Sequence, residues 1–246
     1  HSKNIEEITG LASGYGNVFL QRNSENLGIA IALNQICEAA GKRNSDWVLT
    51  LDQDTICPEK MIKKMSEHTD REDIGIVCPK VDYGNGQHTR NKSDVEFEYP
   101  YACMTSGSLT RVSVWKKIGG FREDFFIDFV DNDYCMRLRL NGFRILRLNS
   151  CVMQHELGET VERRLLGIKK IKCTKHSPLR LYYMSRNNLF FINQYRKKLN
   201  VPKEIAKAVY VILTGYFASD EKKKARQFIR RGIRDAKNGE MGKISV

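Results

Sequence analysis

Two carboxylates follow directly after a short apolar run near residue 50. The run Trp47–Leu51 predicts a buried strand, and Asp52 and Asp54 come at its end in the segment LTLDQDT. In α/β sheets, ligands bind beyond the carboxyl ends of the strands. Hard divalent cations prefer oxygen ligands and often complete their shell with substrate phosphates. The pair therefore predicts a Mg²⁺ or Mn²⁺ site, with an ordinary polar turn as the alternative.

Three more acids gather in the segment FFIDFVDNDYCMR, at the start of a predicted helix: Asp128, Asp131 and Asp133. Like charges in a partly apolar cleft raise the pKa of one carboxyl, which suits a general base. Capping of the helix N-terminus is the alternative. We assign the base role to Asp131, and for Asp128 and Asp133 we leave a supporting role and capping open.

One histidine, His155, follows a predicted strand in the segment VMQHELG. A lone histidine is usually structural. Beside a pair of carboxylates, however, a neutral imidazole could complete the protein ligands of a metal ion.

The elements that must position these residues alternate between short strands and helices. This alternation predicts an α/β domain over residues 1–159, with a mostly parallel sheet flanked by helices. Beyond 160 we expect no further strand and a basic α-helical segment up to residue 246. The expected strands are 47–51, 74–77 (stopped by Pro79), 143–148 and 151–154, and the expected helices are 28–40, 58–65, 111–118, 131–141, 179–198, 202–218 and 221–237.

The positive charge lies in the C-terminal part of the chain. Residues 160–246 carry a net charge of +16, whereas residues 1–159 carry −4. Such asymmetry suggests a polyanionic partner, with a solvated basic face as the alternative. Basic clusters at 196–198 and 222–224 flank the apolar stretch Ala208–Ser219, which is too short to span a bilayer. This arrangement predicts either docking on an anionic membrane surface or packing of the apolar side chains on the catalytic domain.

The seven cysteines are odd in number and form no Cys-x-x-Cys pair. They predict free thiols in a reducing compartment. No signal peptide is recognisable. We therefore expect a cytoplasmic protein, peripheral on the inner face of the plasma membrane.

The ordered set of motifs resembles a family-2 glycosyltransferase of the GT-A fold, most closely the bacterial rhamnosyltransferase branch. The similar segments are ENLGIAIALN (25–34), DWVLTLDQDT (46–55), TSGSLTRVSVWKKIGGF (105–121), FFIDFVDNDYCMRLRLNGFRI (125–145), QHELG (154–158), YYMSRNNLFF (182–191) and RGIRDAKNGEMGK (231–243).

The resemblance implies an inverting transferase that moves a sugar, such as rhamnose, from a dTDP- or UDP-sugar to a glycan or lipid-linked glycan in cell-surface polysaccharide synthesis. It implies that Asp52, Asp54 and His155 hold Mn²⁺ or Mg²⁺ and that Asp131 deprotonates the acceptor. Asp52 would also contact the donor. The nucleotide-sugar site would further include Asn26, Gly28, Thr105, Ser106 and Gly107.

One departure from the family pattern concerns the N-terminal end. The family begins with a strand that carries a base-binding segment, whereas this sequence starts at His1 and Ser2, after that strand. The resemblance therefore predicts a sheet without its N-terminal strand.

Two other functions fit parts of the sequence. LDQDT also fits the nucleophile motif of a haloacid-dehalogenase-like phosphatase, although that motif usually follows the first strand and leaves His155 unexplained. The basic C-terminal part would suit a nucleic-acid-binding module, but no stacking-aromatic or zinc signature accompanies it. We favour the transferase and expect no nucleic-acid partner.

Overall fold

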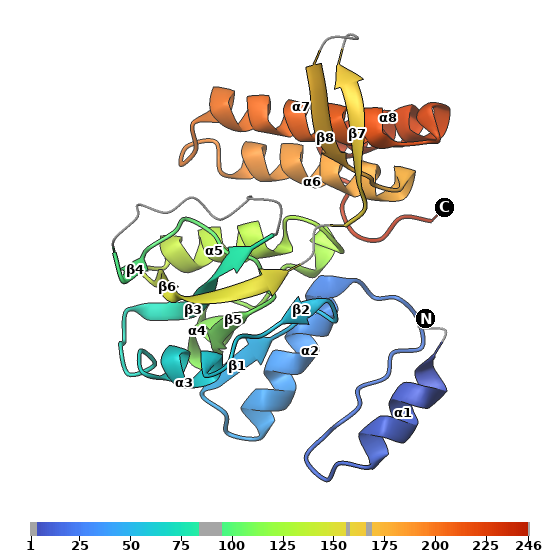
Figure 1. The fold of residues 1–246 in the computed structure, drawn as a ribbon. Coiled ribbons are helices and arrows are strands. Elements are labelled where there is room, and N and C mark those ends of the chain that lie inside the picture. Colours follow the sequence, from blue (N-terminus) through green and yellow to red (C-terminus); the bar gives the residue numbers. More distant parts are fainter. Residues whose placement is uncertain (1–3, 84–94, 156–157, 166–168, 246) are drawn as a thin grey trace.

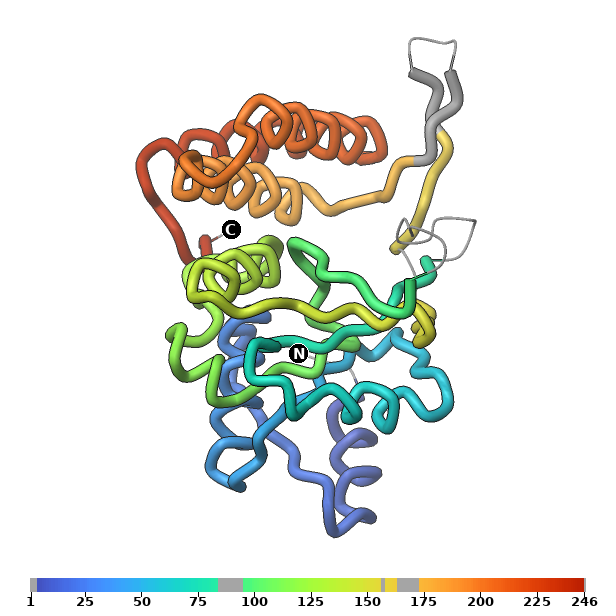
Figure 2. Tube along the Cα trace, turned by 90° about the vertical axis from the view of Figure 1, so that its left-hand side faces the viewer, coloured from blue at the N-terminus to red at the C-terminus, as the bar shows by residue number. Residues whose placement is uncertain are grey.

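The computed structural model describes residues 4–83, 95–155, 158–165 and 169–245. The chain builds two layers (Figure 1): an α/β body, and above it three helices near the C-terminus. Figure 2, turned by 90°, shows the same two layers, linked at one side by the chain segment that carries a hairpin. This arrangement confirms the predicted α/β class.

The central sheet has six strands in the order β1-β5-β3-β6-β2, with β4 also paired to β6. Three of the strands, β1, β3 and β6, point the same way, so their carboxyl ends meet at one edge. The bounds are β1 (Trp47–Thr50), β2 (Thr55–Ile56), β3 (Ile74–Asp82), β4 (Phe97–Glu98), β5 (Ser108–Arg111) and β6 (Arg144–His155).

The prediction of a mostly parallel sheet was wrong. Among the described strands of this sheet, β3 and β6 form the one parallel pair. Strand β5 inserts between β1 and β3 and runs antiparallel to both. The chain enters β5 from an irregular segment rather than through a crossover helix, and a parallel neighbour requires such a crossover.

Two strand boundaries also differ from the prediction. Strand β3 continues through Pro79 to Asp82, because a register shift at Pro79/Lys80 removes the need for a ladder hydrogen bond at the proline. The segments 143–148 and 151–154 form the single strand β6. Its residues between Leu148 and Val152 bulge out of the pairing with β3.

Helices cover both faces of the sheet. The larger core cluster joins α2, α4 and α5 to one face, and a second cluster joins α3 to the other. Neighbouring side chains of β3 divide between them: Ile76 lies in the first cluster and Val77 in the second, as the alternation of a strand requires. The bounds are α1 (Ile5–Ser13), α2 (Ile29–Lys42), α3 (Met61–Ser66), α4 (Val112–Lys117), the 3₁₀ turn η1 (Glu123–Phe125) and α5 (Val130–Leu140).

The C-terminal part contains a hairpin that the sequence did not predict. Strand β7 (Thr160–Leu165) pairs antiparallel with β8 (Lys169–Thr174), so the expectation that strands stop near 160 was wrong. The many basic residues of 160–174 obscure the alternation of a strand in the sequence. The three predicted helices are confirmed as α6 (Pro178–Gln194), α7 (Val201–Ala218) and α8 (Lys222–Asn238). No helix in the described ranges is long and apolar enough to span a membrane.

Helix α6 fastens the helical layer to the α/β body. Arg186 of α6 is fully buried, and its guanidinium donates to the carbonyl oxygens of Gly242 at 2.6 Å and of Asp124 and Phe125 at 3.2 Å. A buried cation of this kind is tolerated because its donors are satisfied. The layer therefore holds the segment that leads into α5.

Candidate active site

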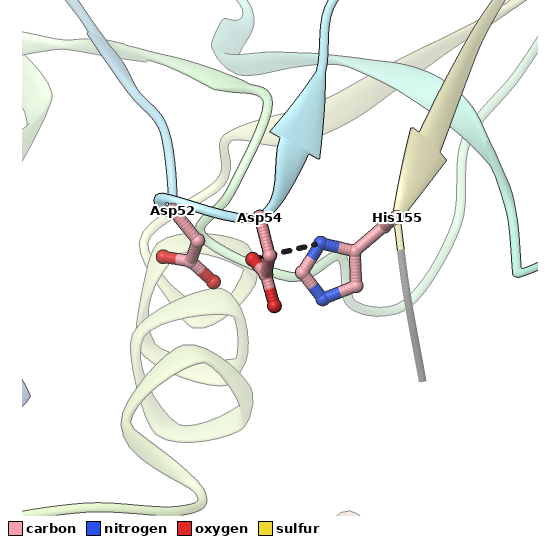
Figure 3. A group of neighbouring side chains, drawn as sticks. All are labelled: Asp52, Asp54 and His155. Carbon is pink, nitrogen blue, oxygen red and sulfur yellow. Dashed lines mark ion pairs between the residues drawn. The ribbon is translucent and has the colours of Figure 1, made fainter. Parts of the chain in front are cut away.

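Asp52, Asp54 and His155 come together at the carboxyl edge of the sheet (Figure 3). One ligand atom of each lies within 4.8 Å of those of the other two, and His155 Nδ1 is 3.7 Å from Asp54 Oδ1. The aspartates follow β1, and the histidine ends β6. Residues about 100 positions apart in sequence meet here because β1 and β6 point the same way.

Thr55 connects this group, a role that the sequence analysis did not assign. Its amide donates to Asp52 O at 3.2 Å, which closes a tight turn around Asp54. It pairs with His155 in the β2–β6 ladder, and its hydroxyl lies 3.3 Å from His155 Nδ1. The same hydroxyl lies 2.6 Å from Ser106 Oγ. The available signal was the position of Thr55 inside LDQDT.

The segment Thr105–Gly107 packs against the start of the Asp52–Thr55 turn. Ser106 Oγ accepts a hydrogen bond from the Asp52 amide at 2.9 Å, and the Gly107 amide donates to Thr50 O at 2.8 Å. Gly107 has φ +78°, and a Cβ there would lie 2.4 Å from Met153 Sδ. Glycine suits this position because it adopts the left-handed conformation without steric cost, and because a Cβ would force the Met153 side chain to shift.

The donor set fits a divalent cation of the Mg²⁺ and Mn²⁺ class. Two carboxylates and an imidazole offer hard oxygen ligands and one nitrogen, which suits Mn²⁺ and accommodates Mg²⁺ through the carboxylates. Desolvation raises the pKa of Asp52, and this is partly opposed by the neighbouring His155. Asp54 and His155 are differently exposed, with side-chain exposures of 49% and 14%. The group is therefore open to solvent on the Asp54 side.

Asp131 lies in the first turn of α5 and reaches a cavity of about 580 Å³ that Asp52 also lines. Its Oδ1 accepts a hydrogen bond from the Asn132 amide at 2.8 Å. Burial raises the pKa of Asp131 to about 6, against the lowering effect of that hydrogen bond; Cys103 and Asp128 add smaller raising contributions. A carboxylate with this pKa can accept a proton near neutral pH.

Asp128 and Asp133 have different surroundings. Asp128 lines the same cavity and pairs with Arg180 of α6 at 3.1 Å. Asp133 is fully buried; it accepts from Arg137 Nε at 2.7 Å and from the Tyr195 hydroxyl at 2.7 Å. Through these hydrogen bonds, Asp133 joins α5 to the end of α6. The structure therefore brings Asp128 to the cavity and engages Asp133 in packing.

Asn26 and Gly28 lead into α2 at the edge of the cavity. The Gly28 amide donates to Asn26 Oδ1 at 3.0 Å, and the next amide, of Ile29, donates to Phe126 O at 2.8 Å. Gly28 has φ +88°, and a Cβ there would lie 2.5 Å from the same Phe126 oxygen. Ile29 lines the cavity, whereas Asn26 is exposed.

The helical layer supplies part of the cavity wall, which the sequence analysis did not predict. Arg180 and Asn188 come from α6, and Glu204 and Lys207 come from α7. The signal was the segment YYMSRNNLFF, which contributed to the resemblance without an assigned role. Two residues of the QHELG motif, at positions 156 and 157, and most of the predicted loop 82–100 lie outside the described residues.

Comparisons with known proteins give the family and the fold. Residues 4–147 match a family model described as "Glycosyl transferase family 2". The curated protein dTDP-rhamnosyl transferase RfbF of Shigella flexneri is 27% identical over 184 residues, which are 69% of this chain. The chain spans 61% of that relative.

Two solved structures share the fold. A mannosyltransferase, PcManGT from Pyrobaculum calidifontis, in complex with GDP-Man and Mn²⁺, aligns with a TM-score of 0.54 at 10% identity, over 99% of this chain and 64% of that one. TarS 1–349 of S. aureus, in complex with UDP-GlcNAc, aligns with a TM-score of 0.51 at 14% identity, over 97% and 79%. These likenesses confirm the predicted fold class.

Proposed function

This chain belongs to glycosyl transferase family 2, and from that premise we propose that it moves a sugar from a nucleotide-diphosphate donor to a glycan acceptor in cell-surface polysaccharide synthesis. One observation carries the proposal. Asp52 of the candidate metal group and Asp131, with its raised pKa, line one cavity of about 580 Å³. A donor held at the metal group and a hydroxyl at Asp131 would share that space.

Asp52, Asp54 and His155 would hold Mn²⁺ or Mg²⁺. A bound cation would neutralise the diphosphate and so favour its departure. Thr55 and Ser106 would fix the turn that aims the two carboxylates, through the bonds of 2.6 and 2.9 Å described above. Gly107 would let the backbone approach the donor sugar beside Thr105. Asn26 and Gly28 would lie toward the nucleotide.

Asp131 would act as the general base. Its carboxylate takes the proton of the acceptor hydroxyl while that oxygen forms a bond to the anomeric carbon. The bond from the anomeric carbon to the diphosphate oxygen breaks, and the nucleoside diphosphate leaves with that electron pair. Attack opposite the leaving group inverts the anomeric configuration. Asp128, held by Arg180 at 3.1 Å, would support the electrostatics of this wall.

The donor class and the acceptor are the finer parts of the proposal. The similarity to a dTDP-rhamnosyl transferase supports dTDP-rhamnose, with UDP-sugars as the next candidates. We propose a glycan acceptor, which can be lipid-linked, and a cytoplasmic location, peripheral on the inner face of the plasma membrane. The net charge of +16 over residues 160–246 supports an anionic surface as partner.

A donor screen tests the proposal. The intact protein is titrated calorimetrically with dTDP-rhamnose and with UDP- and GDP-sugars, each with and without Mn²⁺ or Mg²⁺. We expect metal-dependent binding, strongest for a dTDP- or UDP-sugar. Failure of every nucleotide sugar to bind in the presence of either metal would overturn the transferase assignment.

A further inference from the structure

The outward face of α7 is apolar along the whole helix. At helical spacing it exposes an apolar stripe, defined as Pro202, Ala206, Val209, Tyr210, Leu213 and Phe217. The exposed fractions are large: 49% for Val209, 62% for Tyr210, 47% for Leu213 and 39% for Phe217. A contiguous exposed apolar patch on a folded protein marks an interaction surface.

The outward face of α8 is basic along its whole length. It exposes a basic face, defined as Lys223, Arg226, Arg230, Arg234 and Lys237. The single acidic residue of α8, Asp235, is buried and accepts from the Tyr182 hydroxyl at 2.9 Å. Asp235 also pairs with Arg234 at 3.3 Å, so it neutralises that one member of the basic face. It is the one acid of α8, so Lys223, Arg226, Arg230 and Lys237 keep their charge without a carboxylate partner from this helix.

The two faces belong to neighbouring helices of one layer. Both helices pack on α6: Gly215 of α7 approaches Leu181, and Gly232 of α8 approaches Tyr182 O. Figures 1 and 2 show α7 and α8 on the side of α6 that is remote from the catalytic sheet. The apolar stripe and the basic face are the solvent-exposed parts of these two helices, whereas Gly215 and Gly232 are buried against α6.

We propose that the apolar stripe and the basic face together form a docking surface for an anionic lipid bilayer. An apolar helix face lying in the plane of the interface gains from burial of its side chains among the acyl chains. Adjacent lysines and arginines gain from anionic headgroups, at short range and in a salt-dependent way. The two faces supply both contributions.

Charge favours a bilayer over a second copy of the chain. A two-fold contact through the apolar stripe would bring two basic faces close together, with like charges opposed. An anionic surface instead complements the basic face. In the short apolar stretch between the basic clusters, Val209, Leu213 and Phe217 are exposed and Ile212 is half-buried, so these three exposed side chains do not pack on the catalytic domain.

The proposed docking surface lies on the side of α7 opposite to the active-site cavity. Three residues of α7, namely Glu204, Lys207 and Val211, line the cavity that Asp52 and Asp131 share, while the apolar stripe faces outward. Docking through α7 would hold that cavity beside the bilayer, where a lipid-linked acceptor is found. This last step rests on the proposed transferase activity, whereas the docking surface deepens the proposed membrane location and is tested without that activity.

Vesicle co-sedimentation tests the surface without donor, metal or acceptor, so its result is separate from the transferase assignment. The intact protein is mixed with vesicles of phosphatidylcholine alone, or of phosphatidylcholine with about one third phosphatidylglycerol, which is anionic. Each mixture is measured at low and at high salt. We expect binding to the anionic vesicles only, weakened by salt.

Two variants and two matched controls assign the binding to its surface. Replacing Leu213 and Phe217 by Gln should abolish most binding. Gln at Ile36 and Ile62 of the α/β body, which are exposed at 46% and 65%, should not. Replacing Lys223, Arg226 and Arg230 by Gln should lower the partition coefficient on the order of 10–100-fold. The control with the same charge loss, Gln at Lys42, Lys63 and Lys116, should lower it far less. Circular dichroism verifies that each variant is folded.

Three results would overturn the proposal. The first is absence of binding to anionic vesicles at low salt. The second is equal loss of binding in the variants and their controls, which would show a general charge effect. The third is that the parent chain forms a dimer and binds no vesicles, whereas the Leu213 and Phe217 variant is a monomer. This result would assign the apolar stripe to contact with a second copy of the chain.

Discussion

The side-chain amide of Asn187 in α6 donates to the backbone carbonyl of Asp128 at 2.9 Å. The same nitrogen lies 2.7 Å from Ile127 O and 3.0 Å from Phe125 O, and the amide is fully buried. The segment that it holds contains three non-glycine residues with positive φ: Phe126, Asp128 and Phe129. Such backbone costs about 1–3 kcal/mol per residue and persists only where the surroundings enforce it. Asn187 is therefore a positioning residue for the loop that presents Asp131.

Replacing Asn187 by Ala should lower both stability and turnover. The carbonyls of Ile127 and Asp128 would lose this buried donor, whereas that of Phe125 would keep Arg186. We therefore expect a loss of about 1–3 kcal/mol in the free energy of unfolding. We also expect a lower kcat with KM for the donor nearly unchanged, because the metal group lies on other elements. Asn193→Ala, at an exposed position of the same helix, is the control. Denaturant unfolding and steady-state kinetics measure the two effects, and an unchanged kcat in a destabilised variant would contradict the positioning role.

Replacing Asp54 by Ala should abolish metal-dependent donor binding without unfolding the protein. The side chain is 49% exposed, so its removal leaves the core intact, but it takes one of two carboxylates from the candidate metal group. Calorimetric titration of the donor with and without Mn²⁺ measures the loss, and Glu59→Ala, on the exposed surface nearby, is the control. Unchanged metal-dependent affinity would remove Asp54 from the site.

Replacing Asp131 by Asn should lower kcat by roughly 10²–10⁴-fold while donor affinity is nearly kept, because Asn retains the shape but cannot accept the proton. In the parent protein kcat should rise with pH through about 6, as the carboxyl ionises. Single-turnover kinetics with saturating donor separate the chemical step from product release. Near-normal turnover of the variant would transfer the role of base to Asp128.

Replacing Asp131 by Asn should also raise the free energy of unfolding, and this gain should depend on pH. The pKa of Asp131 is raised from 3.8 to about 6 in the folded protein, so the folded state binds the proton more tightly than the unfolded state. Its ionised form thus destabilises the fold fully above about pH 6 and not at all below about pH 4. Asp131→Asn should raise the free energy of unfolding by about 1–3 kcal/mol at pH 7, with no gain at pH 3.5. A gain that is equal at both pH values would contradict the raised pKa.

Replacing Gly107 by Ala should cost more stability than replacing Gly142 by Ala. Both glycines have positive φ, +78° and +86°, so each substitution carries a left-handed penalty of about 1–2 kcal/mol. Around Gly142 a new Cβ meets nothing within 4 Å, whereas at Gly107 it would lie 2.4 Å from Met153 Sδ. The clash should add about 1–3 kcal/mol. Thermal unfolding of the two variants isolates this packing contribution, and equal losses would show that the Met153 side chain moves aside freely.

The sequence by itself determined the local parts of this protein. Strand β1 and the acids after it could be predicted because an apolar run followed by Asp52 and Asp54 is a local pattern. The same is true of Asp131 at a helix start and of helices α6 to α8, whose periodicity is contained within each segment. His155 was also a candidate ligand from its place after a predicted strand, but its own context does not distinguish a ligand from a structural histidine, and the family resemblance favoured the ligand.

Only the tertiary structure decided how these parts meet. The insertion of β5 between β1 and β3, the pairing of Thr55 with His155 and the contact of Asn187 with Asp128 join residues that are far apart in the chain. Such contacts leave no period in the sequence, because they depend on which elements become neighbours and not on the order of residues within one element. The outward apolar stripe of α7 has the same origin. Its apolar residues are visible in the sequence, but α6 selects which side of the helix is buried, and so leaves Val209, Leu213 and Phe217 exposed.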